Sequence, residues 1–313
     1  MVRRQAFVIG TVTVGVFVLC LTYSLNTHYR ALDHDTLEFN SAPSGDSLPM
    51  NSQHFPKKIW QLWKDDSENL TERTVGFPHK WRMINPQHRY ERFTHDNCNA
   101  YVEDRFPASI SQVFTSLTDP VLRADLLRYL IMMLQGGVWA DIDVFPHQPV
   151  SSWIPKPYHE NSTNLVLGIE NDKHKRPIWP GSPYSIQLAQ YTILAKPNHP
   201  AIISLVDRVI NNLARLFEGK RHPDRVTFAE VMSTTGPFAF TEVMMDYFTN
   251  VTGTKHTGDE LDSITEPRLI GDVLVLPIDS FGWLPRRHQH EASHQSILVE
   301  HLFMGSWRAG HPG

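Results

Sequence analysis

Residues 120–145, PVLRADLLRYLIMMLQGGVWADIDVF, decide the fold class. The first part predicts a helix over residues 120–135, because its leucines and isoleucine recur every three or four residues and the glycine pair 136–137 is a stop signal. The run 138–144 follows at once and alternates in the way of a β-strand. A helix that leads directly into an apolar strand is typical of an α/β domain.

Two aspartates of that run, Asp141 and Asp143, are predicted to share one face of the strand. Paired carboxylates on an apolar strand repel each other, and a divalent cation beside a bound diphosphate relieves this. Same-face neighbours lie about 6.6 Å apart, too far for both to reach one ion at about 2.0–2.6 Å. We therefore expect Asp143 to bind the metal directly, because it lies nearer the carboxyl end of the strand, and Asp141 to act through water or on a ribose. The metal would neutralise a departing nucleotide diphosphate. A second D-x-D pattern, residues 33–35, lacks this helix and strand context.

Further apolar runs support the α/β class. Residues 58–62, 165–169 and 273–276 are predicted strands that alternate with helical patterns. This order favours an α/β sandwich with a mostly parallel central sheet flanked by helices.

The N-terminus predicts a membrane anchor. Residues 6–25 form a run of 20 residues without a charge, preceded by Arg3 and Arg4, which is long enough to span a bilayer with residues 1–5 in the cytosol and the rest in a lumen. A cleaved signal peptide is the alternative, but no small-residue cleavage site follows. Residues 26–54 have the composition of an unfolded stem, and the globular domain is expected over residues 55–310.

Composition limits the function classes. The chain has 313 residues, of which 41% are hydrophobic and 20% charged, and a net charge of -4 gives no electrostatic reason to bind nucleic acid. Cys98 is the one cysteine outside the anchor, so no internal luminal disulfide is expected. Glycosylation sequons at Asn69, Asn161 and Asn250 agree with a luminal domain.

Residues 290–294 match H-E-x-x-H, the pattern of a zinc protease helix. The flanking residues lack the apolar stripe of a buried helix, and the third histidine of the extended motif is absent from its position. A protease is therefore disfavoured.

The run 123–144, RADLLRYLIMMLQGGVWADIDV, resembles the core motif of glycosyltransferase family 32. The resemblance extends over about residues 55–308, through segments 55–66 (FPKKIWQLWKDD), 195–200 (AKPNHP), 235–237 (TGP), 271–281 (GDVLVLPIDSF) and 301–307 (HLFMGSW). It implies a GT-A fold, an Mn²⁺-type cofactor and a GDP-mannose donor. It also implies retaining α-1,6 transfer to a high-mannose N-glycan or mannan acceptor, a single-pass type II Golgi location and a multi-enzyme mannosyltransferase complex.

The same resemblance assigns roles to individual residues. Asp141 and Asp143 would form the catalytic metal motif, which His301 or Ser306 completes. The donor-binding residues would be Ile59, Trp60, Gln61, Asp125, Arg128 and Trp307, with Asp125 on sugar or ribose hydroxyls, Arg128 on sugar or phosphate, and Trp307 over the diphosphate.

Several alternatives stay open at this point. Asp125 and Arg128 could be an exposed helix pair, and His301 and Trp307 could be core aromatics. The donor could be UDP-galactose or UDP-N-acetylglucosamine, the acceptor a glycolipid, or the chain a scaffold subunit without activity. No nucleophile or base is assigned, and Glu242 and Asp279 are candidates only because they lie near matched segments.

Overall fold

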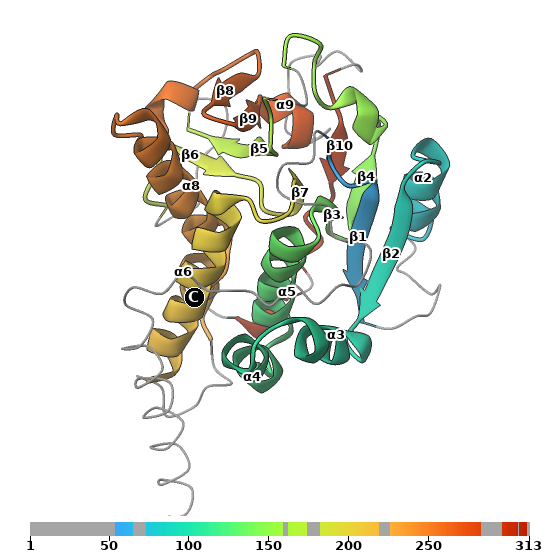
Figure 1. The fold of residues 1–313 in the computed structure, drawn as a ribbon, viewed down its shortest axis with the longest axis vertical. Coiled ribbons are helices and arrows are strands. Elements are labelled where there is room, and N and C mark those ends of the chain that lie inside the picture. Colours follow the sequence, from blue (N-terminus) through green and yellow to red (C-terminus); the bar gives the residue numbers. More distant parts are fainter. Residues whose placement is uncertain are drawn as a thin grey trace, which may run out of the picture.

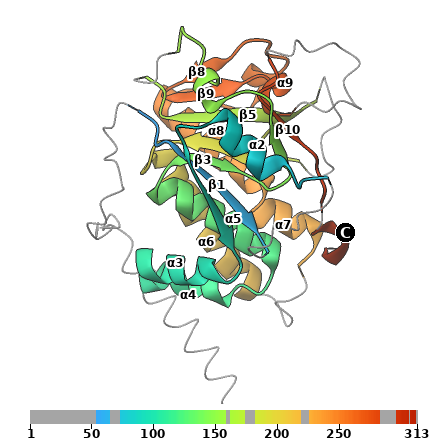
Figure 2. The same ribbon diagram turned by 90° about the vertical axis from the view of Figure 1, so that its right-hand side faces the viewer.

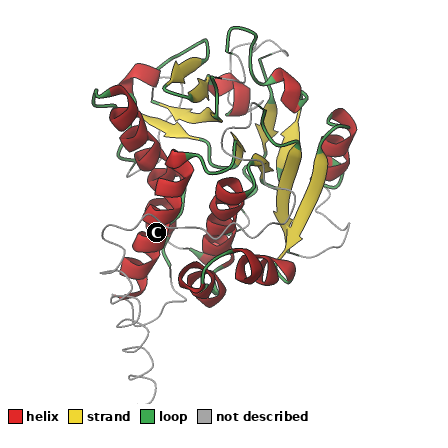
Figure 3. Cartoon of the chain, in the orientation of Figure 1, coloured by secondary structure: helices red, strands yellow, loops and turns green. Residues whose placement is uncertain are grey.

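A mixed β-sheet runs through the middle of the molecule, and helices cover both of its faces (Figures 1 and 3). The structure is a computed structural model that describes residues 54–64, 73–158, 162–173, 182–218, 226–282, 296–305 and 307–311. The predicted anchor and nearly all of the predicted stem lie outside these residues, as do Asn69, Asn161, Ser306 and the H-E-x-x-H stretch. In the part that is described, no helix is both long enough and apolar enough to cross a bilayer.

Strands and helices alternate along much of the described chain. The strands are β1 (Lys58–Trp63), β2 (Arg89–Thr94), β3 (Gly137–Ala140), β4 (Val144–Pro146), β5 (Leu165–Asp172), β6 (Ile186–Leu188), β7 (Thr192–Ala195), β8 (Arg268–Ile270), β9 (Val273–Leu276) and β10 (Val299–His301). The helices are α2 (Phe77–Ile84), α3 (Asn97–Arg105), α4 (Ala108–Ser116), α5 (Pro120–Leu134), α6 (Pro200–Glu218), α7 (Phe228–Thr234), α8 (Pro237–Thr252) and α9 (Ile278–Phe281), and the 3-10 turns are η1 (Val150–Ser152), η2 (Asp259–Leu261) and η3 (Arg308–Gly310). The predicted helix 120–135 and the predicted strands 58–62, 165–169 and 273–276 are confirmed as α5, β1, β5 and β9.

The main sheet has the order β2-β1-β3-β7-β5-β9-β8, with β6 paired to β5. β1 is parallel to β2 and β3, and β5 is parallel to β9, but β7 runs antiparallel to both of its neighbours. The α/β class is thus confirmed, whereas the prediction of a mostly parallel sheet is wrong. The reason is that β6 and β7 both return antiparallel along β5, and an antiparallel return needs no crossover helix.

Neighbouring residues of each strand face opposite layers of the core, as the period of two requires. Trp60 belongs to the cluster that contains α5, α6 and α8, whereas Ile59 packs with Trp81 of α2 and Phe281 of α9 on the other face. Figure 2 shows this layered arrangement from the side. The result is a three-layer molecule in which α5 lies directly against the central strands.

The junction between α5 and β3 depends on two glycines. Gly136 and Gly137 have φ angles of 61° and 88°, a region that strongly favours glycine. A Cβ atom on Gly136 would lie 2.6 Å from the carbonyl oxygen of Ala195, and one on Gly137 would lie 2.7 Å from that of Lys58. The turn therefore ends α5 and brings β3 between β1 and β7, so that the D-x-D segment follows at a fixed place.

Candidate active site

The two aspartates of the D-x-D segment lie on a turn. β3 ends at Ala140, and the amide of Val144 donates to the carbonyl oxygen of Asp141 at 3.0 Å, which closes a turn over residues 141–144. The prediction of one continuous strand over residues 138–144 is therefore wrong. The chain turns out of the main sheet here, and β4 pairs instead with β10 in a separate two-stranded sheet.

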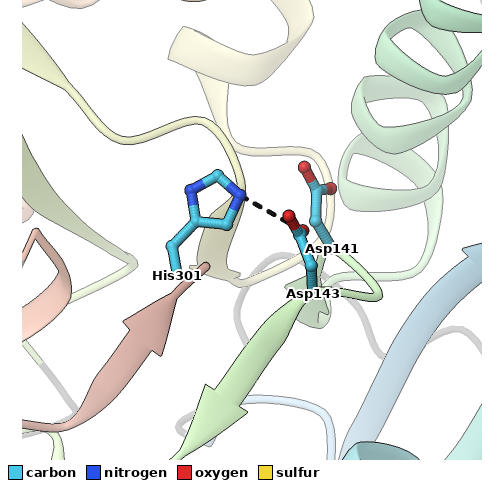
Figure 4. A group of neighbouring side chains, drawn as sticks. All are labelled: Asp141, Asp143 and His301. Carbon is cyan, nitrogen blue, oxygen red and sulfur yellow. Dashed lines mark hydrogen bonds and ion pairs between the residues drawn. The ribbon is translucent and has the colours of Figure 1, made fainter. Parts of the chain in front are cut away.

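Pairing of β4 with β10 brings His301 to the D-x-D segment, because His301 stands opposite Val144 in the register. His301 Nε2 lies 3.1 Å from Asp143 Oδ1, and the amide of Met304 donates to Asp143 Oδ2 at 3.0 Å. Figure 4 shows Asp141, Asp143 and His301 gathered around one point. One ligand atom from each of the three lies within 4.8 Å of the others.

The strand spacing from which a single direct ligand was expected does not apply here, because the two aspartates lie on a turn. Ligand atoms that surround one cation at about 2.0–2.6 Å are up to about 5 Å apart, so both carboxylates and the imidazole can share it. The Nδ1 atom of His301 is buried and has no hydrogen-bond partner within the described residues. Oxygen and imidazole ligands suit a divalent ion of the Mn²⁺ type, and these three residues therefore fit the expected metal.

The surroundings of Asp143 keep its carboxylate ionised, as a cation ligand must be. Burial raises its pKa, but the charge of His301, the His301 hydrogen bond and the Met304 amide lower the pKa of Asp143 to about 2. Burial lowers the pKa of His301, but the carboxylates of Asp143, Asp141 and Glu170 together more than reverse this, so the pKa of His301 is raised overall. Asp143 is consequently ionised at neutral pH, and a metal would compete with the proton on His301.

Arg128 connects α5 to the metal group. Its Nη1 lies 2.8 Å from Asp125 Oδ1, and its Nη2 lies 2.8 Å from Asp141 Oδ1. Trp139 Nε1 donates to the same Asp141 oxygen at 2.8 Å. The Asp125 and Arg128 side chains are only 3% and 4% exposed, so the alternative of an exposed helix pair is wrong.

Asp125 is the buried end of this network. Arg128 binds one carboxylate oxygen, and the hydroxyl of Thr235 donates to the other at 2.8 Å. Burial raises the pKa of Asp125 to about 6 even though the charge of Arg128 and the Thr235 hydrogen bond oppose the shift. Burial alone would lower the pKa of Arg128, but the charges of Asp141 and Asp125 raise it overall. The segment 235–237 thus supports the helix pair, a role that the sequence did not predict.

A cavity of about 500 Å³ opens beside these groups. Six of the residues predicted from the sequence line it, namely Asp125, Arg128, Asp141, Asp143, His301 and Trp307. Trp307 stacks on Phe228 with ring centroids 5.5 Å apart. The C-terminal segment is held near the start of α5, because His311 Nε2 lies 2.6 Å from Asp119 Oδ2.

Three predicted donor-binding residues lie in the core and not in the cavity wall. Ile59 and Gln61 have no exposed surface and Trp60 is buried, and the wall begins with the following residues 62–64 of β1 and its end. Gln61 Nε2 donates to the carbonyl oxygen of Asp141 at 3.0 Å, and Trp60 Nε1 donates to that of Gly136 at 2.8 Å. In this structure these side chains position the backbone of the site.

Other residues of the wall were not predicted. Glu170, Gln190, Tyr191 and Phe228 line the cavity, although no short motif in the sequence marks them. Glu242 and Asp279, the two candidates for a nucleophile or base, do not belong to the cavity wall described here. Asn250 lies exposed near the end of α8, where a sequon is accessible.

Comparison with known proteins identifies a family and several relatives of this chain. The family described as glycosyltransferase sugar-binding region containing DXD motif matches residues 71–160. An initiation-specific alpha-1,6-mannosyltransferase of Schizosaccharomyces pombe is 32% identical over 281 residues, which cover 88% of this chain and 67% of that protein. The protein of the same name from Candida albicans is 30% identical over 93% of this chain and 81% of its own length. The chain belongs to glycosyltransferase family 32.

Members with other acceptors in their names are more distant. Inositol phosphoceramide mannosyltransferase 1 of Schizosaccharomyces pombe is 26% identical over 54% of this chain and 55% of that protein. Among solved structures, the PaToxG glycosyltransferase is 16% identical, covers 79% of this chain and 81% of its own, and superimposes with a TM-score of 0.40. The family match and the mannosyltransferase relatives show that the chain is a glycosyltransferase of the family. Its own sheet shows an α/β domain around a mixed sheet.

Proposed function

We propose that the chain transfers mannose from GDP-mannose to a glycan hydroxyl and forms an α-1,6 linkage with retention of configuration. The observation that carries this proposal is the group of Asp141, Asp143 and His301 on the wall of a cavity, in a chain whose relatives are named alpha-1,6-mannosyltransferases. High-mannose N-glycans or mannan would be the acceptors, as in the initiation of an outer chain.

Asp141, Asp143 and His301 would hold the Mn²⁺ ion. When bound, the metal supplies positive charge against the departing diphosphate. Arg128 fixes the orientation of Asp141 by its 2.8 Å ion pair, so that both carboxylates stay directed at one point. Trp307, stacked on Phe228 at the rim, offers an indole N–H and a ring face to the nucleotide part of the donor.

The proposal includes a location. The uncharged run 6–25 preceded by two arginines would anchor the chain in the Golgi membrane as a single-pass type II protein, with the catalytic domain in the lumen and a place in a multi-enzyme mannosyltransferase complex. Expression of the chain with a C-terminal tag, followed by protease protection in intact vesicles, tests this orientation. Digestion of the tag without detergent would contradict it.

A glycolipid acceptor is the second candidate, because inositol phosphoceramide mannosyltransferases are among the relatives. UDP-galactose and UDP-N-acetylglucosamine are the alternative donors, and a scaffold subunit is the alternative without catalysis. The scaffold is disfavoured because Asp141, Asp143 and His301 lie together and ion pairs hold them, Asp141 with Arg128 and Asp143 with His301. A protein without activity does not require this arrangement.

The decisive experiment incubates the purified chain with Mn²⁺, a panel of sugar nucleotides, and either a high-mannose glycan or an inositol phosphoceramide. We expect a mass gain of one hexose on the glycan with GDP-mannose, and an α-1,6 bond by linkage analysis. Asp143→Ala should abolish transfer, whereas Asp35→Ala, in the other D-x-D pattern, should leave it unchanged. No mass gain with any donor, together with intact partner assembly by Asp143→Ala, would favour the scaffold.

A further inference from the structure

Glu170 is a buried carboxylate on the wall of the cavity that the proposed mechanism leaves without a role. It lies on β5, is 6% exposed, and lines the same cavity as the metal group and Trp307. Burial of a carboxylate is costly. A buried acid that borders a binding cavity is therefore a candidate for contact with what the cavity holds.

A β-bulge places this residue. In the pairing of β5 with β6, Ile169 stands opposite Leu188 and Asn171 stands opposite Gln187, so the register shifts by one residue and Glu170 is the extra one. β5 and β6 lie side by side in Figure 1. A bulge redirects the side chain of its extra residue, and such bulges are frequent beside active sites.

The carboxylate is also held in a fixed orientation. Gln187 Nε2 donates to Glu170 Oε2 at 2.8 Å, and both side chains are buried. Gln187 lies on β6, which itself is tied to α8 because the hydroxyl of Thr241 accepts a hydrogen bond from the amide of Leu188 at 3.0 Å. Two elements of the fold thus restrain one acid at the cavity wall.

The charge of Glu170 indicates which part of a sugar nucleotide it meets. It lies outside the group of ligand atoms formed by Asp141, Asp143 and His301, although its charge acts on His301. A carboxylate repels phosphate oxygens in a site of low dielectric constant. Positive charge, in contrast, develops on the sugar carbon when a diphosphate leaves, and a fixed negative group stabilises it.

We propose that the Glu170 carboxylate contacts the reacting sugar and stabilises the positive charge that develops at its anomeric carbon, an inference that rests on the proposed transfer from a sugar nucleotide. The bond between that carbon and the diphosphate oxygen breaks, and its electron pair goes to the diphosphate. The acceptor oxygen bonds to the carbon, and the acceptor proton leaves on the diphosphate. Glu170 itself neither forms nor breaks a covalent bond. It acts as a catalytic residue because its negative charge touches the reacting sugar.

The test compares Glu170→Gln with wild type in Mn²⁺, with release of nucleoside diphosphate as the readout. The substitution keeps the shape and removes the charge, and we expect turnover to fall by about 10²–10³-fold, as for other preorganised electrostatic groups. The affinities for Mn²⁺ and for the donor should stay within about threefold. Glu170→Asp, which restores the charge, should recover at least tenfold of the lost turnover.

Stability separates this role from a structural one. A group placed for catalysis is not optimised for folding, so Glu170→Gln should melt at the wild-type temperature or above it. The matched control is Glu242→Gln, on the solvent side of α8, where the carboxylate is 47% exposed and lies 3.3 Å from Arg208. Its turnover should stay within twofold of wild type.

Each other result overturns the proposal. Turnover of Glu170→Gln within fivefold of wild type, a parallel loss of Mn²⁺ affinity, a lowered melting temperature, or no recovery in Glu170→Asp would assign Glu170 to the metal or to the fold. Because the assay uses a donor panel, turnover of a sugar nucleotide other than GDP-mannose would contradict the proposed function while leaving the Glu170 comparison intact. If no donor in the panel released a nucleoside diphosphate, both the proposed function and the proposed role of Glu170 would be contradicted.

Discussion

Arg128→Met tests whether one buried cation holds the site together. The Arg128 side chain is 4% exposed, and two of its nitrogens each lie 2.8 Å from a carboxylate oxygen, one on Asp125 and one on Asp141. Methionine keeps much of the volume but removes the charge and the donors. Removal of one partner from a buried ion pair costs about 3–5 kcal/mol, because the other charge is left uncompensated. We expect the free energy of unfolding near pH 7.5 to fall by about this amount.

The pH dependence of this loss identifies its cause. Burial raises the pKa of Asp125 to about 6 with Arg128 beside it, and removal of Arg128 would raise that pKa further. A carboxyl with a higher pKa in the folded state contributes stability that is fully present below the unfolded pKa and is lost as the pH rises through the folded pKa. Arg128→Met should therefore lie closer to wild type at about pH 5.5 than at about pH 7.5.

Urea unfolding of the purified chain at both pH values measures the two effects. The matched control is Arg208→Met, because Arg208 is 35% exposed and pairs with Glu242 and Asp246 at 3.3 and 3.0 Å. An exposed pair is worth at most about 1 kcal/mol, so this variant should differ little from wild type at either pH. A loss below about 1 kcal/mol in Arg128→Met, or an equal loss at both pH values, would refute the assignment of Arg128 as the buried cation of the site.

Three other features give further tests. Mn²⁺ affinity, measured by calorimetry, should rise from about pH 6 to 8, because only a neutral imidazole binds metal. Carboxylate neighbours raise the pKa of His301 despite its burial. The variant His301→Ala should abolish the rise in affinity. Gly137→Ala should lower the free energy of unfolding by at least about 1–2 kcal/mol. The reason is that Gly137 has a φ of 88° and an added Cβ would lie 2.7 Å from the carbonyl oxygen of Lys58 in β1. In the control Gly76→Ala the added Cβ has no atom within 4 Å, so the free energy of unfolding should change little. Burial raises the pKa of Asp272, but histidine, asparagine and tyrosine hydrogen bonds lower it overall, so its stabilising contribution is present above the unfolded pKa and is lost as pH falls. In acid unfolding, Asp272→Asn should therefore be less stable than wild type at neutral pH, and the difference should shrink steadily as the pH falls below about 4.

Much of the fold could be predicted from local patterns along the chain. Leucines at helical spacing determine α5, and short apolar runs identify β1, β5 and β9. Gly136 and Gly137 end the helix because their backbone conformation favours glycine. The pair Asp125 and Arg128 also follows from the sequence, since residues three apart on a helix are neighbours. These features depend on residues close together in the chain, so the sequence contains their cause.

The direction of the strands could not be predicted in this way. β7 runs antiparallel to β3 and β5, and no periodicity within β7 distinguishes that pairing from a parallel one. Likewise, the alternation of residues 138–144 suits a single strand, but the pairing of β4 with β10 turns the chain at Asp141. Hydrogen bonds between distant segments decide these points.

The sequence by itself determined that two acids follow a helix, a glycine turn and an apolar strand, and that the chain carries the motifs of its family. The tertiary structure decided which groups meet them. His301 lies 158 positions from Asp143 and reaches it through β10. Glu170, at the bulge of β5 against β6, meets the cavity through the packing of the sheet. Local spacing fixes which residues share a face, but a site is assembled by long-range pairing, whose register is set by the packing of the whole core.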